Sequence, residues 1–198
     1  FHGMVRDVNK QKMSKSKGNV ISPTEMSNKY GTDALRMALV VGNTPGSDMA
    51  LSEDKIKGYK HFANKIWNVS RFVLDNTKDF DFNNKPEIKD DDKKNLDDLA
   101  TKIEEITEDI ESFKFYLAGE KLYHYFWHNF ADVIIEKSKI NLTSQDKTER
   151  VSAQWTLLKI LETSLKLLHP FMPFITEEIW SMLPGKNKML IIEQWPKI

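Results

Sequence analysis

The residues best suited to chemistry lie near the start of the chain, in the stretch 12–19 with the sequence KMSKSKGN. Lysine ammonium groups bind phosphate as adaptable point charges, and small hydroxyl side chains add further hydrogen-bond donors. Gly18 and Asn19 supply a flexible end. We interpret the stretch as a mobile loop that delivers positive charge to a polyphosphate; a basic patch on nucleic acid and a plain solvated loop are the alternatives. Four lysines fall within eight residues that contain no acid: Lys10, Lys12, Lys15 and Lys17.

Residues 12–16, KMSKS, resemble the signature loop of class I aminoacyl-tRNA synthetases, and the KGN that follows fits the same pattern. Further blocks, in the right order, resemble the valine, leucine and isoleucine subgroup: YGTDALR at 30–36, GNTPGSD at 42–48, FANKIWNVSRF at 62–72 and HPFMPFITEEIW at 169–180. The pair TPGSD and FANKIWNVSRF is most similar to the valyl members, because leucyl and isoleucyl members usually resemble APPE or SPPW at the first block. A leucyl or isoleucyl relative is the alternative.

The resemblance implies a reaction and a role for the loop. In this family an amino-acid carboxylate attacks the α-phosphate of ATP, and cations near the departing pyrophosphate lower the barrier. By this resemblance Lys15 stabilises the developing charge and Lys12 assists it. The residues implied to contact ATP are Lys12, Met13, Ser14, Lys15 and Ser16. The resemblance also implies Mg²⁺ that arrives with ATP, a valine tRNA as partner, and the remainder of a synthetase chain.

The length of the chain limits what it can do alone. With 198 residues it can form one domain with a core plus an appendage, whereas a synthetase of this subgroup is several times longer. It begins at Phe1 without an initiator methionine and has no HIGH-type block, so we expect a fragment that does not aminoacylate by itself. The lack of cysteine excludes disulfides and Cys-based zinc sites and is typical of a cytoplasmic protein. No apolar run approaches the roughly 18 residues of a membrane span.

Charge is distributed unevenly, although 29 basic and 29 acidic residues cancel overall. Residues 1–86 hold 14 basic and 9 acidic side chains, whereas residues 87–111 hold 4 basic and 11 acidic ones. A polyanion would be attracted by the first segment and repelled by the second. An RNA-binding surface is therefore expected to be local, and the global charge is uninformative.

Helix-start and helix-stop signals predict a mainly α fold in two domains. A small strand–loop–helix segment over 1–51 carries the KMSKS-like loop, and a helical bundle covers 52–198. The resemblance implies that the first is the end of a catalytic and stem-contact region and that the second is an anticodon-binding domain. Ser22, Pro23 and Glu25 form a capping-box start for a short helix that ends at Gly31. The other predictions for the first segment are a strand and turn over 1–9, a helix capped by Thr32 and ended by Gly42, and a loop over 42–51.

Apolar residues spaced by three and four predict the helices of the bundle. Ser52 caps the first of them, which runs through Leu74 with an apolar face that includes Ile56, Phe62 and Ile66. The further predictions are a linker over 75–95, a helix from Leu96 to Leu117, a helix over 119–140 with Leu122, Phe126, Phe130, Val133 and Ile134 inward, a helix over 149–168, a short helix from Thr176 to Met182, and an extended Met189–Trp195.

The polar face of the helix that Ser52 begins is basic. From Lys55 to Leu74 the sequence has five Lys or Arg side chains and no acid. A solvated helix face and a contact with the RNA backbone both explain this pattern. The residues that we expect to contact tRNA are Lys57, Lys60, Asn64 and Arg71.

Two rival interpretations remain. Glu120, His124 and His128 are spaced by four on one helical face, and paired histidines on a helix can bind a metal. The Glu-x-x-His and His-Glu-x-x-His patterns are absent, however, and the neighbours are aromatic, so we favour a packed helix and expect no metal site in this chain. For the whole chain the rival is a non-catalytic helical module that binds RNA or protein, with an incidental lysine-rich loop.

Overall fold

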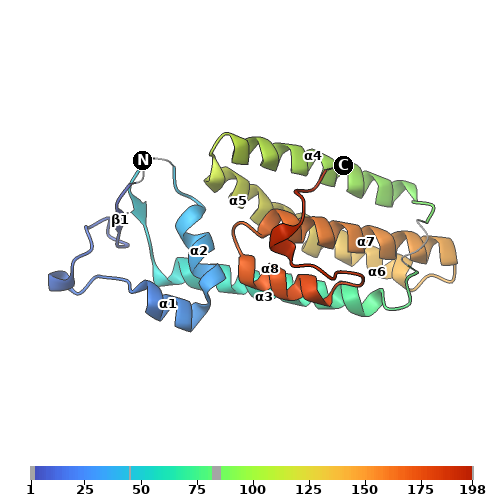
Figure 1. Cartoon of the computed structure of the whole chain (residues 1–198), viewed down its shortest axis with the longest axis horizontal. Helices are drawn as coiled ribbons and strands as arrows, with labels where there is room; N and C mark the ends of the chain where they lie inside the picture. Colours follow the sequence, from blue (N-terminus) through green and yellow to red (C-terminus); the bar gives the residue numbers. More distant parts are fainter. Residues whose placement is uncertain (1–2, 45, 82–85, 198) are drawn as a thin grey trace.

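The computed structural model describes residues 3–44, 46–81 and 86–197. Figure 1 shows a small part that contains β1, α1 and α2 at one end of an elongated helical bundle. The mainly α prediction is confirmed. Within the described residues no helix is both long enough and apolar enough to cross a membrane. The chain start at Phe1 and part of the predicted linker, residues 82–85, lie outside the described residues.

The small part combines two short strands with two helices. Strand β1 (Val5–Arg6) pairs in parallel with β2 (Met49–Ala50), which confirms the strand predicted within 1–9. The prediction of an uninterrupted loop over 42–51 is wrong, because the backbone N–H of Met49 donates to Met4 O at 3.0 Å and forms this second strand. Between the strands lie the 3-10 turn η1 (Lys15–Lys17), α1 (Pro23–Tyr30) and α2 (Thr32–Val40).

The predicted helix caps are confirmed at two of three positions. Ser22 Oγ accepts from the N–H of Glu25 at 3.4 Å, and Ser52 Oγ accepts from the N–H of Lys55 at 3.0 Å. Thr32 does not cap α2 and is already its first residue, because Gly31 turns the chain one residue earlier with a φ of 92°. Only glycine adopts that backbone conformation without strain.

The bundle consists of long helices that Figure 1 shows running side by side. Its elements are α3 (Glu53–Asn76), α4 (Asp90–Glu111), α5 (Phe115–His124), the π-helical segment η2 (Tyr125–Ile134), α6 (Ile135–Leu142), α7 (Lys147–Leu168), α8 (Pro173–Met182) and the 3-10 turn η3 (Leu190–Ile192). Helix α7, predicted over 149–168, is buried on nearly all sides and forms the centre of the bundle.

Helix α4 begins and ends earlier than the sequence predicts. Its start at Asp90 makes the predicted linker over 75–95 too long, and it places three aspartates at the positive end of the helix, where negative charge is stabilising. The predicted single helix from Leu96 to Leu117 is wrong, because the chain turns at Phe113. Phe113 has a φ of 58° and is 75% exposed, so it lies outside the core and interrupts the apolar face predicted from Leu96 to Leu117.

One continuous helical run connects α5, η2 and α6, as predicted over 119–140, but its centre is π-helical. A π-helical turn contains more residues than an α-helical turn, so side chains along it rotate away from a 3.6-residue pattern. Val133, predicted to face inward, is accordingly 43% exposed. The other four predicted inward residues are buried: Leu122, Phe126, Phe130 and Ile134.

Helix α8 begins at Pro173, three residues before the predicted Thr176. Proline suits a first helical position because it has no N–H that needs a partner. The predicted extended run Met189–Trp195 is interrupted, because Leu190–Ile192 forms a 3-10 turn. Of these two elements, α8 packs against α2, and the 3-10 turn packs against α8.

The buried apolar residues form two clusters, and α2 contributes to both. Met37 and Val41 at the end of α2 belong to the main cluster of the bundle. Ala34, Leu35 and Ala38 belong to a second cluster beneath the small part. Helix α2 is therefore a shared wall between the loop-bearing part and the bundle.

Candidate functional site

The lysine-rich loop is closed by Asn19, which the sequence analysis treated only as a flexible end. The Ser14 N–H donates to Asn19 Oδ1 at 2.9 Å, and Asn19 Nδ2 donates to Asp7 Oδ2 at 2.8 Å and to Lys12 O at 3.4 Å. Gly18 has a φ of 67° and ends the turn η1. One amide side chain thus joins both ends of the loop and attaches them to the segment before it.

Asp7 is the centre of this support. Its Oδ1 accepts from the N–H of Asn9 at 3.0 Å and of Gln11 at 2.8 Å, while its other oxygen accepts from Asn19. The hydrogen bond from Asn19 is the main cause that lowers the pKa of Asp7, followed by that from Gln11. The carboxylate therefore stays ionised and holds the loop at neutral pH.

The base of the loop is fixed to the small sheet. Arg6 forms an ion pair with Asp48, and Asp48 Oδ1 accepts from the N–H of Met4 at 2.9 Å. Arg6 also donates through Nη1 to Lys10 O at 3.2 Å. The backbone hydrogen bond from Met4 and the guanidinium of Arg6 lower the pKa of the Asp48 carboxyl. The chain before the loop is thus tied to the chain before α3.

The five loop residues predicted to contact ATP lie in three different surroundings. Lys12 and Lys15 are exposed, so their ammonium groups face solvent. Met13 is half-buried and packs against the second apolar cluster. The hydroxyl groups of Ser14 and Ser16 lie 3.1 Å apart. The arrangement presents cations to a polyanion while one apolar side chain anchors the loop.

The four predicted tRNA-contact residues are all exposed along α3: Lys57, Lys60, Asn64 and Arg71. At 1.5 Å rise per residue they extend over roughly 20 Å of helix. Lys60 is partly engaged, because its Nζ donates to Lys29 O at 3.3 Å and lies 5.7 Å from the Tyr30 ring centroid.

Two further lysines lie beside half-buried aromatic rings next to α3, but each is also paired with an acid. Lys65 Nζ lies 5.6 Å from the Trp127 ring centroid and 2.8 Å from Asp132 Oδ1. Lys139 Nζ lies 5.8 Å from the Phe72 ring centroid. The sequence analysis missed these pairs, because Trp127 and Lys139 come from a different helix than α3, and only the fold brings them beside it.

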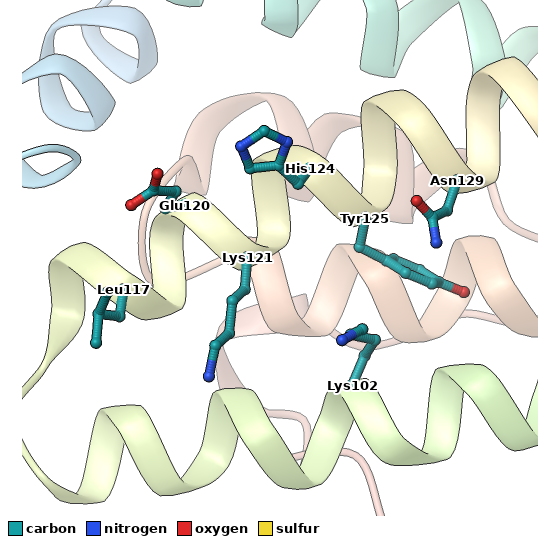
Figure 2. Close-up of a pocket in the computed structure, with 7 residues that line it drawn as sticks. All are labelled: Lys102, Leu117, Glu120, Lys121, His124, Tyr125 and Asn129. Atoms are coloured by element: carbon teal, nitrogen blue, oxygen red, sulfur yellow. The ribbon is translucent and has the colours of Figure 1, made fainter.

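A separate cavity of about 520 Å³ lies between α4 and α5 (Figure 2). Its lining residues are Lys102, Leu117, Glu120, Lys121, His124, Tyr125 and Asn129. Both lysines have acidic partners on α4: Lys102 Nζ lies 2.8 Å from Glu105 Oε2, and Lys121 Nζ lies 2.6 Å from Asp109 Oδ2. The cavity is therefore not an electropositive site, and we assign it no ligand.

The rival metal site is not assembled in the described part of the chain. The rings of His124 and His128 lie 5.4 Å apart, and His128 Nδ1 is 3.5 Å from Asp132. Within the described residues no group of three or more His, Cys, Asp or Glu side chains has an arrangement that could hold a metal ion.

Comparison with known proteins places both parts of the chain. The family described as "Anticodon-binding domain of tRNA ligase" matches residues 92–198, and the family described as "tRNA synthetases class I (I, L, M and V)" matches residues 1–52. The valine–tRNA ligases of Pseudothermotoga lettingae and Thermotoga maritima are each 43% identical over 198 residues. They match 100% of this chain, which spans 23% and 22% of their own lengths.

Solved structures agree with this placement. A leucyl-tRNA synthetase of Agrobacterium radiobacter K84, in a ternary complex with tRNA and LeuAMS, superposes with a TM-score of 0.75 at 26% identity and covers 100% of this chain and 23% of its own. A methionyl-tRNA synthetase of Mycobacterium tuberculosis superposes with a TM-score of 0.76 at 19% identity over 94% of this chain and 38% of its own, which shows a shared fold. The chain thus belongs to the anticodon-binding domain family of tRNA ligases, whose model matches residues 92–198, and its first 52 residues, which include the loop, match the class I tRNA synthetases.

Proposed function

We propose that this chain is part of a valine–tRNA ligase, in which the loop 12–19 acts on ATP and the helical bundle binds tRNA. One observation carries the proposal: two valine–tRNA ligases match the chain from end to end at 43% identity. The chain spans less than a quarter of those relatives, so we expect it to need the rest of the ligase for aminoacylation. The cytoplasmic location inferred from the lack of cysteine stays a prediction.

In the proposed reaction the valine carboxylate attacks the α-phosphate of ATP, and negative charge builds up on the departing pyrophosphate. Lys15, with Lys12, stabilises that charge as the loop closes, because fixed cations act most strongly where charge develops. Ser14 and Ser16 supply hydroxyl donors, and Met13 keeps the loop attached to the second apolar cluster. We propose that Mg²⁺ enters with ATP, because this ion keeps several of its waters and is held largely by substrate phosphates.

The role of Lys15 can be tested in the ligase that contains this chain. Lys15→Ala should slow valine-dependent ATP–pyrophosphate exchange about 100- to 1,000-fold, the range observed when one donor to a developing anion is removed. Binding of tRNA should change little. Lys94→Ala is the matched control, because Lys94 is an exposed lysine on α4. Exchange at the parental rate in Lys15→Ala would show that the assignment is wrong.

For tRNA we propose that the exposed face of α3 contacts the backbone through Lys57, Lys60, Asn64 and Arg71. Binding of the 198-residue chain to tRNA should weaken with salt, and each lost lysine or arginine contact should reduce the slope of log affinity against log salt by about one. Lys57→Ala and Arg71→Ala should each show this, whereas Lys94→Ala should not. Equal, salt-independent binding of unrelated RNA would favour the rival helical module.

A separate experiment tests which amino acid the ligase activates. Valine should support ATP–pyrophosphate exchange by the ligase far better than leucine or isoleucine at equal concentration. Exchange that depends on leucine or isoleucine instead would replace the valine assignment with one of those two, while the proposed roles of the loop and the bundle would stand.

A further inference from the structure

Two side chains of α2 connect the loop-bearing part to the turn between α7 and α8. Both oxygens of the Asp33 carboxylate accept backbone hydrogen bonds, from the N–H of Phe174 at 3.2 Å and of Ile175 at 2.7 Å. These N–H groups belong to the first turn of α8, which begins with Pro173 and has no cap from its own preceding residue, Met172. Helix α8 thus receives its N-terminal cap from α2, a type of contact that stabilises a helix start.

Arg36, one turn further along α2, contacts the other side of the same turn. Its Nη2 donates to Pro170 O at 2.9 Å, and its Nε donates to Phe171 O at 3.2 Å. These carbonyls follow the C-terminal end of α7, where positive charge is favourable, whereas Asp33 faces the N-terminal end of α8, where negative charge is favourable. The acid and the base on α2 therefore match the opposite ends of two helices of the bundle.

The Asp33 side of this contact is buried, whereas Arg36 is exposed. Asp33 is 7% exposed, and burial raises the pKa of its carboxyl while the N–H donors of Ile175 and Phe174 oppose that shift. At the other end of α2, a Cβ placed on Gly119 of α5 would lie 2.7 Å from Val41 Cγ2 and 3.4 Å from the Phe171 ring. Glycine at this position lets α5 approach the end of α2 directly. The shared wall therefore has little room to shift against the bundle.

The opposite face of α2 leads to the loop. Ala34, Leu35 and Ala38 form the second apolar cluster, and Met13 of the loop packs against that cluster. A continuous path of contacts thus connects the lysine-rich loop to the α7–α8 turn, and α2 is its central member. In Figure 1, α2 lies between the β1 end of the molecule and the bundle.

We propose that Asp33 and Arg36 are positioning residues for the loop: they fix α2 on the α7–α8 turn and so set where Lys12 and Lys15 lie relative to the bundle. The functional half of this inference rests on the proposed role of the loop in the reaction with ATP. Neither residue belongs to the loop; each acts through α2 and Met13.

The claim that Asp33 and Arg36 fix the position of the loop can be tested without an activity assay. We call this the positional half of the inference. The chain has no cysteine, so spin labels at Val20→Cys and Glu104→Cys, both exposed sites, report one distance between the loop segment and α4. Pulsed electron spin resonance should give a narrow distance distribution in the parent and broader ones in Arg36→Gln and Asp33→Asn. Asp97→Asn, an exposed acid on α4, is the control and should stay narrow. Distributions as narrow as the parent's in both variants would overturn the proposal.

A double-mutant cycle in the ligase tests the functional half. Arg36→Gln should lower kcat of ATP–pyrophosphate exchange about tenfold with KM for valine within about twofold, because misplacing a reacting group by about 1 Å costs up to about 100-fold. In a Lys15→Ala background the same change should cost almost nothing, since both act through one loop. An equal loss in both backgrounds would overturn the positioning role. An unchanged rate in Lys15→Ala alone would instead refute the proposed role of the loop, and the spin-label result would still decide the positional half.

Discussion

The loop and the bundle each depend on an aspartate that accepts a side-chain hydrogen bond, but the two carboxyl groups have opposite surroundings. Asp7 accepts from Asn19 beside the exposed loop, whereas Asp92 accepts from Ser152 inside the bundle and is 3% exposed. Hydrogen bonds lower the pKa of Asp7, while burial raises the pKa of Asp92. Apart from its apolar anchor at Met13, the loop therefore rests on polar contacts near the surface, whereas the bundle keeps its shape through groups that water does not reach. A loop supported in this way can move while the bundle stays folded.

The largest expected loss of stability comes from a buried aromatic residue of the bundle. Phe62 is fully buried and its ring centroid lies 4.8 Å from that of Tyr123. Phe62→Ala should lower the free energy of unfolding by about 3–5 kcal/mol, measured by urea denaturation. Val20→Ala, at an exposed apolar residue of the loop segment, should change it by no more than about 0.5 kcal/mol. Equal losses in the two variants would break the contrast.

The next largest loss of stability is expected when a buried hydrogen bond of the bundle is removed. Ser152→Ala removes the hydroxyl that donates to Asp92 and also accepts from the N–H of Lys89 at 2.9 Å. It leaves a buried carboxyl and a backbone N–H without this partner, so we expect a loss of about 1–3 kcal/mol in thermal or urea unfolding. Ser16→Ala removes an exposed hydroxyl from the loop and should cost no more than about 0.5 kcal/mol.

Removing the corresponding hydrogen bond at the loop should affect only the structure of the loop. Asn19→Ala removes the donor to Asp7 and the acceptor for the Ser14 N–H. The free energy of global unfolding should shift by no more than about 0.5 kcal/mol, while amide hydrogen exchange at Ser14 becomes faster. A global loss as large as that of Ser152→Ala would mean that the loop folds as one unit with the bundle.

The pH dependence should differ in direction between the two aspartates. Because the pKa of Asp7 is lowered below 3.8 in the folded chain, its stabilising contribution is present above pH 3.8 and is lost as the pH falls through the lowered pKa. Because the pKa of Asp92 is raised above 3.8, its contribution is present below pH 3.8 and is lost as the pH rises through the raised pKa.

The free energy of unfolding, measured as a function of pH for the parent and for one variant at each aspartate, tests both directions. The stability advantage of the parent over Asp7→Asn should shrink below pH 3.8, and its advantage over Asp92→Asn should shrink above that value. Carbon-13 NMR titration of the two carboxyl groups reports the same shifts directly. Parallel trends in the two variants would contradict the contrast between the loop and the bundle.

Local signals in the sequence predicted local structure well. Ser22 and Ser52 begin the helices expected of them. The lysines of the loop and Lys57, Lys60 and Arg71 of α3 are exposed, as the motif and the periodicity indicated. Each of these features depends on residues within a few positions of one another. The roles proposed for the loop and for the basic face stay predictions.

The features that the sequence did not predict depend on distant residues. Asp7 and Asn19 join across 12 positions, and Asp33 reaches α8 from far earlier in the chain, so no short pattern reveals either contact. The turn at Phe113 places an aromatic residue in solvent, which runs against its expected burial. The proposed boundary between residues 51 and 52 also stays a prediction, and α2 contributes side chains to both clusters beside it.

The cap that α2 provides for α8 has a consequence for synthesis of the chain. Asp33 precedes Phe174 and Ile175 by 141 and 142 residues, so its carboxylate has no α8 N–H to accept from until that intervening length has been made. Contacts between residues so far apart form slowly, because the long loop between them must close first. During translation Asp33 and Arg36 of α2 would lack these partners after α3 and α4 had formed. A nascent chain stopped before Phe174 should therefore be more sensitive to protease than one released after α8.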